Sequence, residues 1–215
     1  MASGFNVDRF RASLGFRGGV LKTNKFAVSF TLPPVFDDDA NRTLYLSLCQ
    51  DAELWCDAAS IPGLVQQNLK FRRYGYGSLD TAPLSVNFDD IQLRFIVDGQ
   101  GDNWRLFQKW HNKIINTNSL KGLWSGGTEI SGGAFDLFPY EVGWQSDYET
   151  GILVTWFTEN GDEAKTIYLN QAFPTAISEV KLDWGDGGDV ARFIVNFSIQ
   201  DWQFRDQYSN PVNGS

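Results

Sequence analysis

The clearest hairpin in the sequence is ILVTWFTENGDEAKTIYL, residues 152–169. Apolar residues alternate on both sides of a polar turn, which is the period-two pattern of β-strands. The turn contains Asn160 and Gly161, and the Asn-Gly pair accepts the positive φ angles of a type I′ turn. We therefore predict an antiparallel hairpin, with one strand that begins near Tyr148 and a returning strand at Ala164–Leu169.

Other segments on both sides of this hairpin also read as strands. Lys25–Leu32 and Leu44–Leu48 alternate and predict a hairpin with a long tip at Pro33–Thr43, which contains Asp37, Asp38 and Asp39. Leu64–Tyr76 is predicted to be extended, and Leu84–Val97 to be a strand pair interrupted by a bulge at Asp89 and Asp90. A last hairpin, Val180–Trp184 with Phe193–Ile199, is predicted to close the sheet near Trp202.

Helical spacing occurs in two places. Trp104, Phe107, Trp110 and Ile114 recur at the period of a helix that Asp102 can cap. A weaker amphipathic pattern at Val7–Leu14 ends at Gly15 and predicts a short helix. The expected fold is therefore mainly β, an antiparallel β-sandwich or barrel with one flanking α-helix and a short N-terminal helix.

The length of 215 residues suits one domain, because a chain of this size buries roughly 70% of its unfolded surface. We predict a single domain over residues 1–215, with an N-terminal extension at 1–23, a long glycine-aromatic loop at 116–147 and a frayed tail at 205–215. Loops of that length are usually functional or disordered, and the aromatic residues in this one argue against a free linker.

The charge balance is acidic, with 18 Lys and Arg against 26 Asp and Glu, a net charge of −8 and a pI near 4.6. This excludes a strongly basic nucleic-acid binder. No apolar run approaches the roughly 18 residues that span a bilayer, and the polar start lacks a signal core. We expect a soluble protein of a reducing cytoplasm in which Cys49 and Cys56 are small thiols, buried or partly buried.

The titratable residues do not form a recognisable catalytic pattern. Acidic clusters occur at Asp37–Asp39, at Asp89 with Asp90, and at Asp183, Asp186 and Asp189, and each is predicted to be a solvated turn or strand end. The last cluster lacks the spacing of a calcium loop, and the two cysteines lack zinc-ligand spacing. His111 has no GxSxG elbow as a partner. The sequence thus predicts no enzyme, no metal site and no cofactor.

Two further features leave alternatives open. Lys70, Arg72 and Arg73 alternate with Tyr74 and Tyr76, a patch suited either to stacking and phosphate contacts or to a strand rim with intersubunit salt bridges. The 32 aromatic residues suit a β core, a large subunit interface or the exposed platforms of a carbohydrate-binding β-sandwich. A hydrolase with an acid pair is a further alternative.

Three segments, in this order, resemble the tail tube protein family of contractile-tailed bacteriophages. The first is Asn24–Val28 followed by a Leu/Cys strand and Ile61-Pro62-Gly63. The second is Phe88–Asp98, which leads to Leu106, Phe107 and Trp110 on a helix. The third is Phe173-Pro174-Thr175 with Val180–Trp184 and Phe193–Trp202. The resemblance covers about Asn24 to Trp202.

This resemblance implies a structural virion protein whose hexameric rings stack into the inner tail tube, through which phage DNA is ejected. Expected partners are copies of the chain, neighbouring tube or baseplate proteins, the tail sheath, the tape-measure protein and passing DNA without specific binding, with no membrane. The expected location is the virion tail, assembled in the host cytoplasm. A tube-initiator ring of the baseplate is the alternative within the family.

The sequence departs from the common tube subunit at its N-terminal segment, at Pro33–Thr43 and at the glycine-aromatic loop. We predict subunit contacts at Phe36 and Asp38 in the segment Pro33–Thr43. We predict further subunit contacts in the glycine-aromatic loop, at Trp124, Phe135 and Phe138. From the acidic balance we further predict that many acidic residues lie on one sheet that faces the lumen, where they would repel phosphate.

Overall fold

A seven-stranded antiparallel sheet forms the body of the molecule. The computed structural model describes residues 7–16, 20–37, 39–115, 142–182, 184–185 and 188–205. The sheet order is β1-β6-β7-β8-β5-β2, and β9 also pairs with β7. The strands are β1 Phe26–Phe30, β2 Cys56–Ala59, β5 Ile91–Ile96, β6 Thr150–Phe157, β7 Glu163–Ile177, β8 Arg192–Ser198 and β9 Asp201–Arg205. The predicted mainly antiparallel β fold is confirmed.

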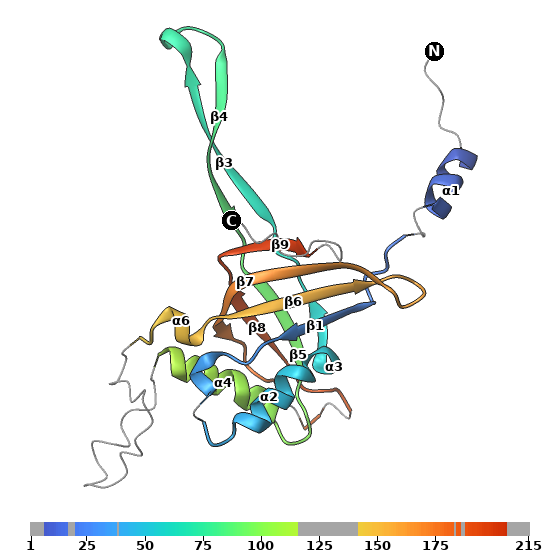
Figure 1. Cartoon of the computed structure of the whole chain (residues 1–215), viewed down its shortest axis with the longest axis vertical. Helices are drawn as coiled ribbons and strands as arrows, with labels where there is room; N and C mark the ends of the chain where they lie inside the picture. The colour runs from blue at the N-terminus through green and yellow to red at the C-terminus, as the bar shows by residue number, and fades with distance from the viewer. Residues whose placement is uncertain are drawn as a thin grey trace, which may run out of the picture.

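Strand β7 folds the sheet onto itself. Its first part pairs with β6 and β9, and its last residues pair with β8. Between these parts Gln171 has a φ of 51°, a left-handed conformation that is uncommon for a residue with a side chain. The sheet therefore closes into a barrel-like sandwich in which β1 and β2, the two ends of the strand order, lie in contact (Figure 1).

The predicted flanking helix is α4, Asp102–Ile114, and it supplies the centre of the core. Trp110 is fully buried, and its indole Nε1 donates to the carbonyl oxygen of Tyr148 at 2.8 Å. Phe107 packs against Phe95 in a tilted arrangement, with ring centroids 4.9 Å apart. Tyr148 ends the short helix α6, Gln145–Tyr148, just before β6. The predicted N-terminal helix is also present, as α1 at Val7–Phe16.

The prediction of a strand at Leu44–Leu48 is wrong, because α2 spans Arg42–Gln50. The buried residues here are Tyr45 and Cys49, one helical turn apart, whereas Leu44 is 38% exposed. The alternating leucines are therefore not the residues that this segment buries. The segment before α2 contains the 3₁₀ helix η1, Pro34–Phe36, and the segment after it contains α3, Ala52–Trp55.

The predicted strand at Val180–Trp184 is also absent, since residues 178–182 have no strand assignment. The partner of β8 is instead the end of β7, which runs past the predicted limit at Leu169 and through Pro174. A register shift between Pro174 and Ala176 accommodates the proline, which cannot donate to a ladder.

Strands β3, Leu64–Arg72, and β4, Leu79–Phe88, form a separate two-stranded ribbon. Their turn contains the 3₁₀ helix η2, Arg73–Gly75. Figure 1 shows this ribbon standing out from the barrel on the side opposite to α2 and α4. Asp89 and Asp90 are not a bulge as predicted; they join the ribbon to β5 of the barrel.

Both cysteines are buried and free, as predicted. Burial raises the pKa of Cys49 and of Cys56 to about 12. Asp38, Asp183, Asp186, most of the glycine-aromatic loop (116–141) and the tail from 206 lie outside the described residues. Within the described residues, no helix is both long and apolar enough to cross a membrane.

Candidate assembly interface

The projecting ribbon of β3, η2 and β4, residues 64–88, is here called the arm. Every residue of β3 is solvent-exposed. The register pairs Leu69 with Ala82 and Phe71 with Asp80, and directly paired residues of antiparallel strands share a face. Val65, Leu69 and Phe71 therefore lie on one face, each at least 40% exposed. In a single subunit, the apolar side chains of that face are therefore exposed to water.

The opposite face of the arm is also partly apolar. Val86 pairs with Gln66 and Leu79 pairs with Arg72, and these two apolar side chains are about half exposed. Each strand of a two-stranded sheet also has one edge of unpaired backbone groups. An isolated two-stranded ribbon is at best marginally stable in water. The arm thus has the chemistry of a segment that another protein surface covers.

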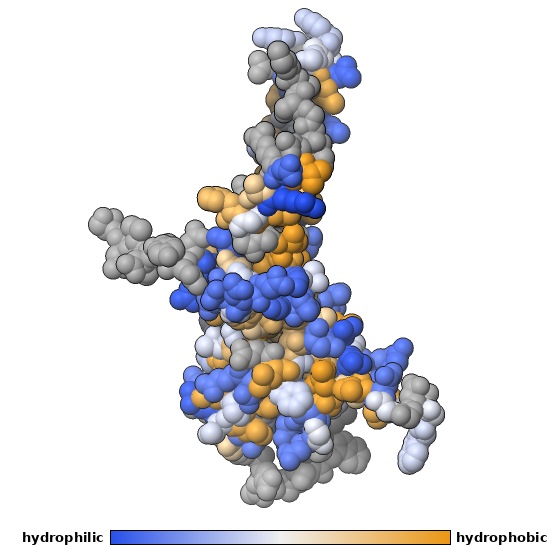
Figure 2. Space-filling view, turned by 90° about the vertical axis from the view of Figure 1, so that its right-hand side faces the viewer, coloured by the Kyte–Doolittle hydropathy of each residue, from blue (hydrophilic) through white to orange (hydrophobic). Residues whose placement is uncertain are grey.

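The tip of the arm contains the basic and aromatic patch seen in the sequence. Tyr74 and Tyr76 are 88% and 85% exposed, and Tyr74 has a φ of 57°. Lys70 and Arg72 are exposed on the strand that leads to the tip. Figure 2, which views the molecule from the side of α1, shows hydrophobic atoms among hydrophilic ones over the projecting part of the molecule.

An aromatic cluster joins the base of the arm to the barrel. Phe88, the last residue of β4, meets Trp202 of β9 edge to face, with ring centroids 6.5 Å apart. Trp202 also meets Phe204 at 5.3 Å. Trp202 is partly buried against the core, whereas Phe204 is 53% exposed. The arm is therefore anchored to the sheet at the strand that pairs with β7.

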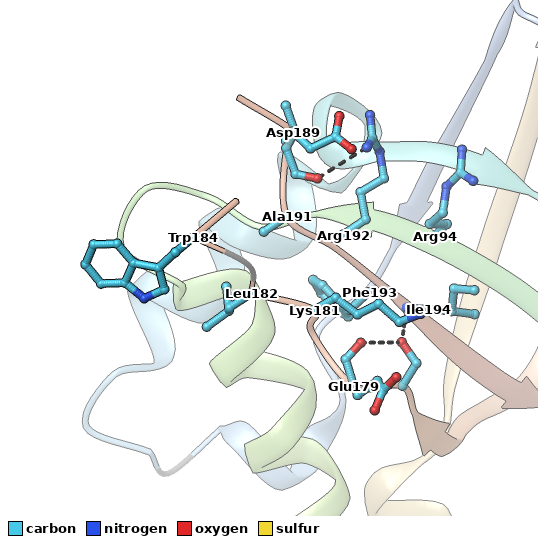
Figure 3. A pocket seen from close by; sticks show the side chains of 12 residues that line it. Arg94, Glu179, Lys181, Leu182, Trp184, Asp189, Ala191, Arg192, Phe193 and Ile194 are labelled. Carbon is cyan, nitrogen blue, oxygen red and sulfur yellow. Dashed lines mark hydrogen bonds between the residues drawn. The ribbon is translucent and has the colours of Figure 1, made fainter. Parts of the chain in front are cut away.

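A second exposed apolar surface follows β7. Leu182 and Trp184 are 84% and 105% exposed, and Val190 is 49% exposed. They border a cavity of ≈ 710 Å³ that is also lined by Arg94 and Arg192 (Figure 3). Figure 3 shows the Trp184 indole pointing away from the other labelled side chains of the cavity. Large apolar side chains at such exposure are typical of contact surfaces.

Beside this cavity, Asp57 of β2 bridges Arg94 of β5 and Arg192 of β8. The two arginine Nε atoms donate to its carboxylate oxygens at 2.7 and 2.9 Å. Burial alone would raise the pKa of Asp57, but the hydrogen bonds from Arg94 and Arg192 lower it below its ordinary value. This ion pair network fixes three strands on the outer face of the barrel.

Another pocket, of ≈ 530 Å³, is polar and is lined in part by Glu149, Gln171 and Gln200. The Nε2 of Gln171 donates to Oε1 of Glu149 at 3.2 Å. Glu149 is the single carboxylate in its lining, so the pocket offers no acid pair. Across the described residues, no three His, Cys, Asp or Glu side chains gather in a way that could hold a metal ion.

The predicted contact residues have different outcomes. Phe36 is fully buried and packs on Tyr45 with ring centroids 5.2 Å apart, so its side chain belongs to the core of its own subunit and does not fit the predicted interface role. Asp38, Trp124, Phe135 and Phe138 lie outside the described residues. The contacts predicted for these four stay predictions.

The arm itself was missed by the sequence reasoning, which paired Leu84–Phe88 with Ile91–Val97. The signal that could have found it is the glycine pair Gly75 and Gly77 between two segments of similar length.

The expected acidic sheet is not found among the described strands. Among the strand residues, the acidic ones are Asp57, Asp80, Glu163 and Asp201, on four different strands. The other acidic residues of the described chain lie in turns, loops and helices. In the part of the chain that the structure describes, neither sheet therefore gathers many carboxylates.

The sequence matches the family model described as phage tail tube protein over residues 21–205. This range contains the whole barrel and the arm, and it excludes α1. A comparison with curated proteins gives no match.

Solved structures with a similar fold come from contractile injection systems. The tube-sheath complex of the extracellular contractile injection system PVC, in its extended state, matches with a TM-score of 0.52 and 13% identity, over 94% of this chain and 99% of that chain. The cap that terminates the tube of the anti-feeding prophage matches with a TM-score of 0.55 and 16% identity, over 86% and 91%. The baseplate of the same particle matches with a TM-score of 0.53 and 14% identity, over 86% and 95%.

Proposed function

Since the chain belongs to the phage tail tube protein family, we propose that its copies form hexameric rings that stack into the inner tube of a phage tail, through which DNA passes during ejection. The protein is a structural component in this proposal. Its ring would lie inside the sheath in the virion tail, after assembly in the host cytoplasm.

The arm is the observation that supports this proposal. It presents apolar side chains on both faces and unpaired backbone on both edges, whereas the barrel buries a continuous core. A ring or stack of identical subunits covers such a segment by head-to-tail contact, because each subunit then gives its arm and receives that of a neighbour. The arm therefore serves as the main connection between copies.

The same chemistry also supports contacts to unlike partners. The surface around Leu182 and Trp184 lies on the barrel and not on the arm, so a subunit has apolar surface left for a sheath, tape-measure or baseplate protein. A tube-initiator ring of the baseplate is the second candidate function, supported by this additional surface. An initiator meets different proteins on its two faces, whereas a repeating subunit meets itself.

The test is negative-stain electron microscopy of the purified protein over a concentration series. Six-fold rings or tubes are the expected result. Rings that stay single until a second tail protein is added would favour the initiator. A protein that remains monomeric at every concentration would overturn the proposal, and binding to a glycan array by that monomer would favour the carbohydrate-binding alternative.

A pair of arm variants makes the test specific. Leu69→Ser with Phe71→Ser removes the apolar contact of one arm face, and we expect the loss of rings and tubes with an unchanged circular dichroism spectrum, because both side chains are exposed in the subunit. Gln67→Ser changes a polar residue on the same face and should assemble like the unchanged protein.

A further inference from the structure

The arm and the connection from β7 to β8, residues 178–191, lie at opposite ends of strand β5. The arm ends at residue 88, and β5 begins just beyond it at Ile91. The last residue of β5, Ile96, pairs with Arg192, the residue that follows the connection. A strand of six residues is about 20 Å long. Figure 1 likewise shows the arm and the described parts of this connection on opposite sides of the barrel.

The arm is long enough to reach another subunit. Strands β3 and β4 have nine and ten residues, and a strand rises about 3.3 Å per residue, so the ribbon is about 30 Å long. The ribbon extends away from the barrel, so it does not contact the far end of its own β5 (Figure 1). The arm and the β7–β8 connection can therefore meet only between copies.

Five residues of this connection are here called the receiving surface: Glu179, Leu182, Trp184, Asp189 and Val190. They all line the cavity of ≈ 710 Å³, and the three apolar side chains among them are between 49% and 105% exposed. Figure 3 shows Leu182 and Trp184 on one side of this cavity. Pockets of about 300–1,000 Å³ hold small ligands, so the cavity has room for a few side chains of a partner.

The side of the arm that carries Lys70 and Arg72 has the matching chemistry. Arg72 pairs with Leu79, which is 54% exposed and shares this side. At the tip, Tyr74 and Tyr76 are 88% and 85% exposed. These five residues are here called the basic face of the arm. Tyrosine and arginine are enriched among the residues that dominate binding energy at protein interfaces, so this face is suited to a protein partner.

The charges of the two surfaces are opposite and are not paired within the described part of the subunit. Lys70 and Arg72 are exposed and have no ion pair with a described residue. The same holds for Glu179 and Asp189 of the receiving surface. Opposite charges on two surfaces favour their association and fix its register. The basic face and the receiving surface are therefore complementary in charge as well as in apolar exposure.

The cavity also has three cations in its lining, Arg94, Lys181 and Arg192. Both arginines donate to the carboxylate of Asp57, so they already have a partner in the subunit. Lys181 is exposed and has no ion pair with a described residue. The two carboxylates of the receiving surface outnumber this lysine and stay available to a basic partner.

We propose that the arm of one copy docks on the receiving surface of another copy. The cations of the basic face then meet the two carboxylates, and the tyrosines of the tip meet the exposed indole of Trp184. The inference rests on the proposed function, because head-to-tail copies bring the two ends of the molecule together. At the last ring of a stack the receiving surface stays free, and there it serves the contact to an unlike tail protein.

The first experiment reverses the charges on each side of the contact. Lys70→Glu with Arg72→Glu changes the arm, and Glu179→Lys with Asp189→Lys changes the receiving surface. In about 0.05 M NaCl we expect each variant to need at least about tenfold more protein for half assembly, measured by sedimentation velocity. This loss should shrink in about 0.5 M NaCl, because salt screens exposed charges. All four side chains are exposed, so the circular dichroism spectrum should not change.

The specific prediction concerns the combination of both variants. Four reversed charges restore the attraction with opposite sign, so the combined variant should regain most of the assembly. The matched control joins the arm variant to Asp51→Lys and Asp162→Lys, at two exposed carboxylates outside the receiving surface, which restores the net charge equally. Equal rescue by this control would overturn the inference, since net charge alone would then explain it. Absence of rescue in the combined variant would also overturn it.

A cross-link locates the contact directly. Cys49 and Cys56 are buried, so introduced thiols at exposed positions are the ones that oxidise. The variant Tyr74→Cys with Leu182→Cys should give a ladder of disulfide-linked multimers under mild oxidation, whereas Tyr74→Cys with Asp162→Cys should give none.

Electron microscopy of the same samples separates this inference from the proposed function. Rings or tubes without a ladder would mean that the arm docks elsewhere, which overturns the inference and leaves the proposed function standing. If the unchanged protein forms no ring or tube, the proposed function fails, and this inference fails with it.

Discussion

Phe88 and Trp202 meet edge to face at the base of the arm, with an interplanar angle of 79°. Phe88 ends the arm, and Trp202 lies on β9, which pairs with the central strand β7. This aromatic contact links the projecting ribbon to the sheet beside the chain connection through Asp89 and Asp90. The orientation of the arm therefore depends on residues that lie more than a hundred positions apart in the sequence.

Trp202→Ala should loosen the arm and destabilise the subunit by about 1–3 kcal/mol, less than a fully buried tryptophan, because Trp202 is only partly buried. Hydrogen exchange should show faster exchange in residues 64–88, and urea denaturation should give the free energy of unfolding. Trp184→Ala is the control, since an exposed side chain should change stability by less than about 0.5 kcal/mol. Equal exchange in both variants would contradict the anchoring role.

Trp110→Phe should cost about 1–3 kcal/mol of unfolding free energy, because it leaves the buried carbonyl of Tyr148 without its 2.8 Å donor and opens space in the core. Trp104 lies on the same helix, and its buried Nε1 has no hydrogen-bond partner among the described residues. Trp104→Phe should therefore cost clearly less in the same urea titration. If the two variants were equally unstable, the hydrogen bond would not be the reason.

The cysteines predict a loss of stability in alkali. Their pKa is about 12 in the folded protein, against 9.0 for the unperturbed thiol. A raised pKa stabilises the fold below pH 9.0, and this stabilisation is lost as pH rises toward 12, by about 1.4 kcal/mol per pH unit and thiol. Unfolding free energies measured across this window should fall less steeply for Cys49→Ala. Identical slopes would rule out burial of this thiol.

The ion pairs of Asp57 predict a loss of folding stability at acidic pH. Its lowered pKa means that its ion pairs stabilise the fold above the ordinary value of 3.8 and are lost as pH falls through the folded pKa. Asp57→Asn should cost about 1 kcal/mol at neutral pH and less as the solution is acidified. Asp189→Asn, at an exposed carboxylate with no described ion pair, should have no such pH dependence. Thermal unfolding at several pH values provides the measurement.

The hydrophobic pattern predicted the secondary structure correctly where the buried residues recur at the period of the strand or helix that contains them. The turn at Asn160 and Gly161 joins β6 to β7 as predicted, although only Gly161 has a positive φ, of 92°, so the turn is not of the predicted type I′. Trp104, Phe107 and Trp110 lie on α4, which packs one face on the core. In both places a single element determines which side chains face inward, so neighbouring residues contain the information.

Two alternating segments gave the wrong answer. The three leucines of residues 44–48 alternate as in a strand, but the buried residues of this segment are Tyr45 and Cys49. Leu182 and Trp184 alternate on a segment that pairs with no strand and are left in solvent. Period-two spacing shows that a strand is possible, and only a neighbouring strand with free hydrogen-bonding groups makes one.

The sequence alone determined the antiparallel β class, the central hairpin, the helix of the core and the likeness to tail tube proteins, because these follow from local periodicity and from the order of motifs. Only the tertiary structure decided that Phe36 is a core residue, that β3 pairs with β4 as an arm, and that few of the described carboxylates lie on strands. The reason is physical: burial and strand pairing depend on segments far apart in the chain, and their contacts form only in the folded subunit.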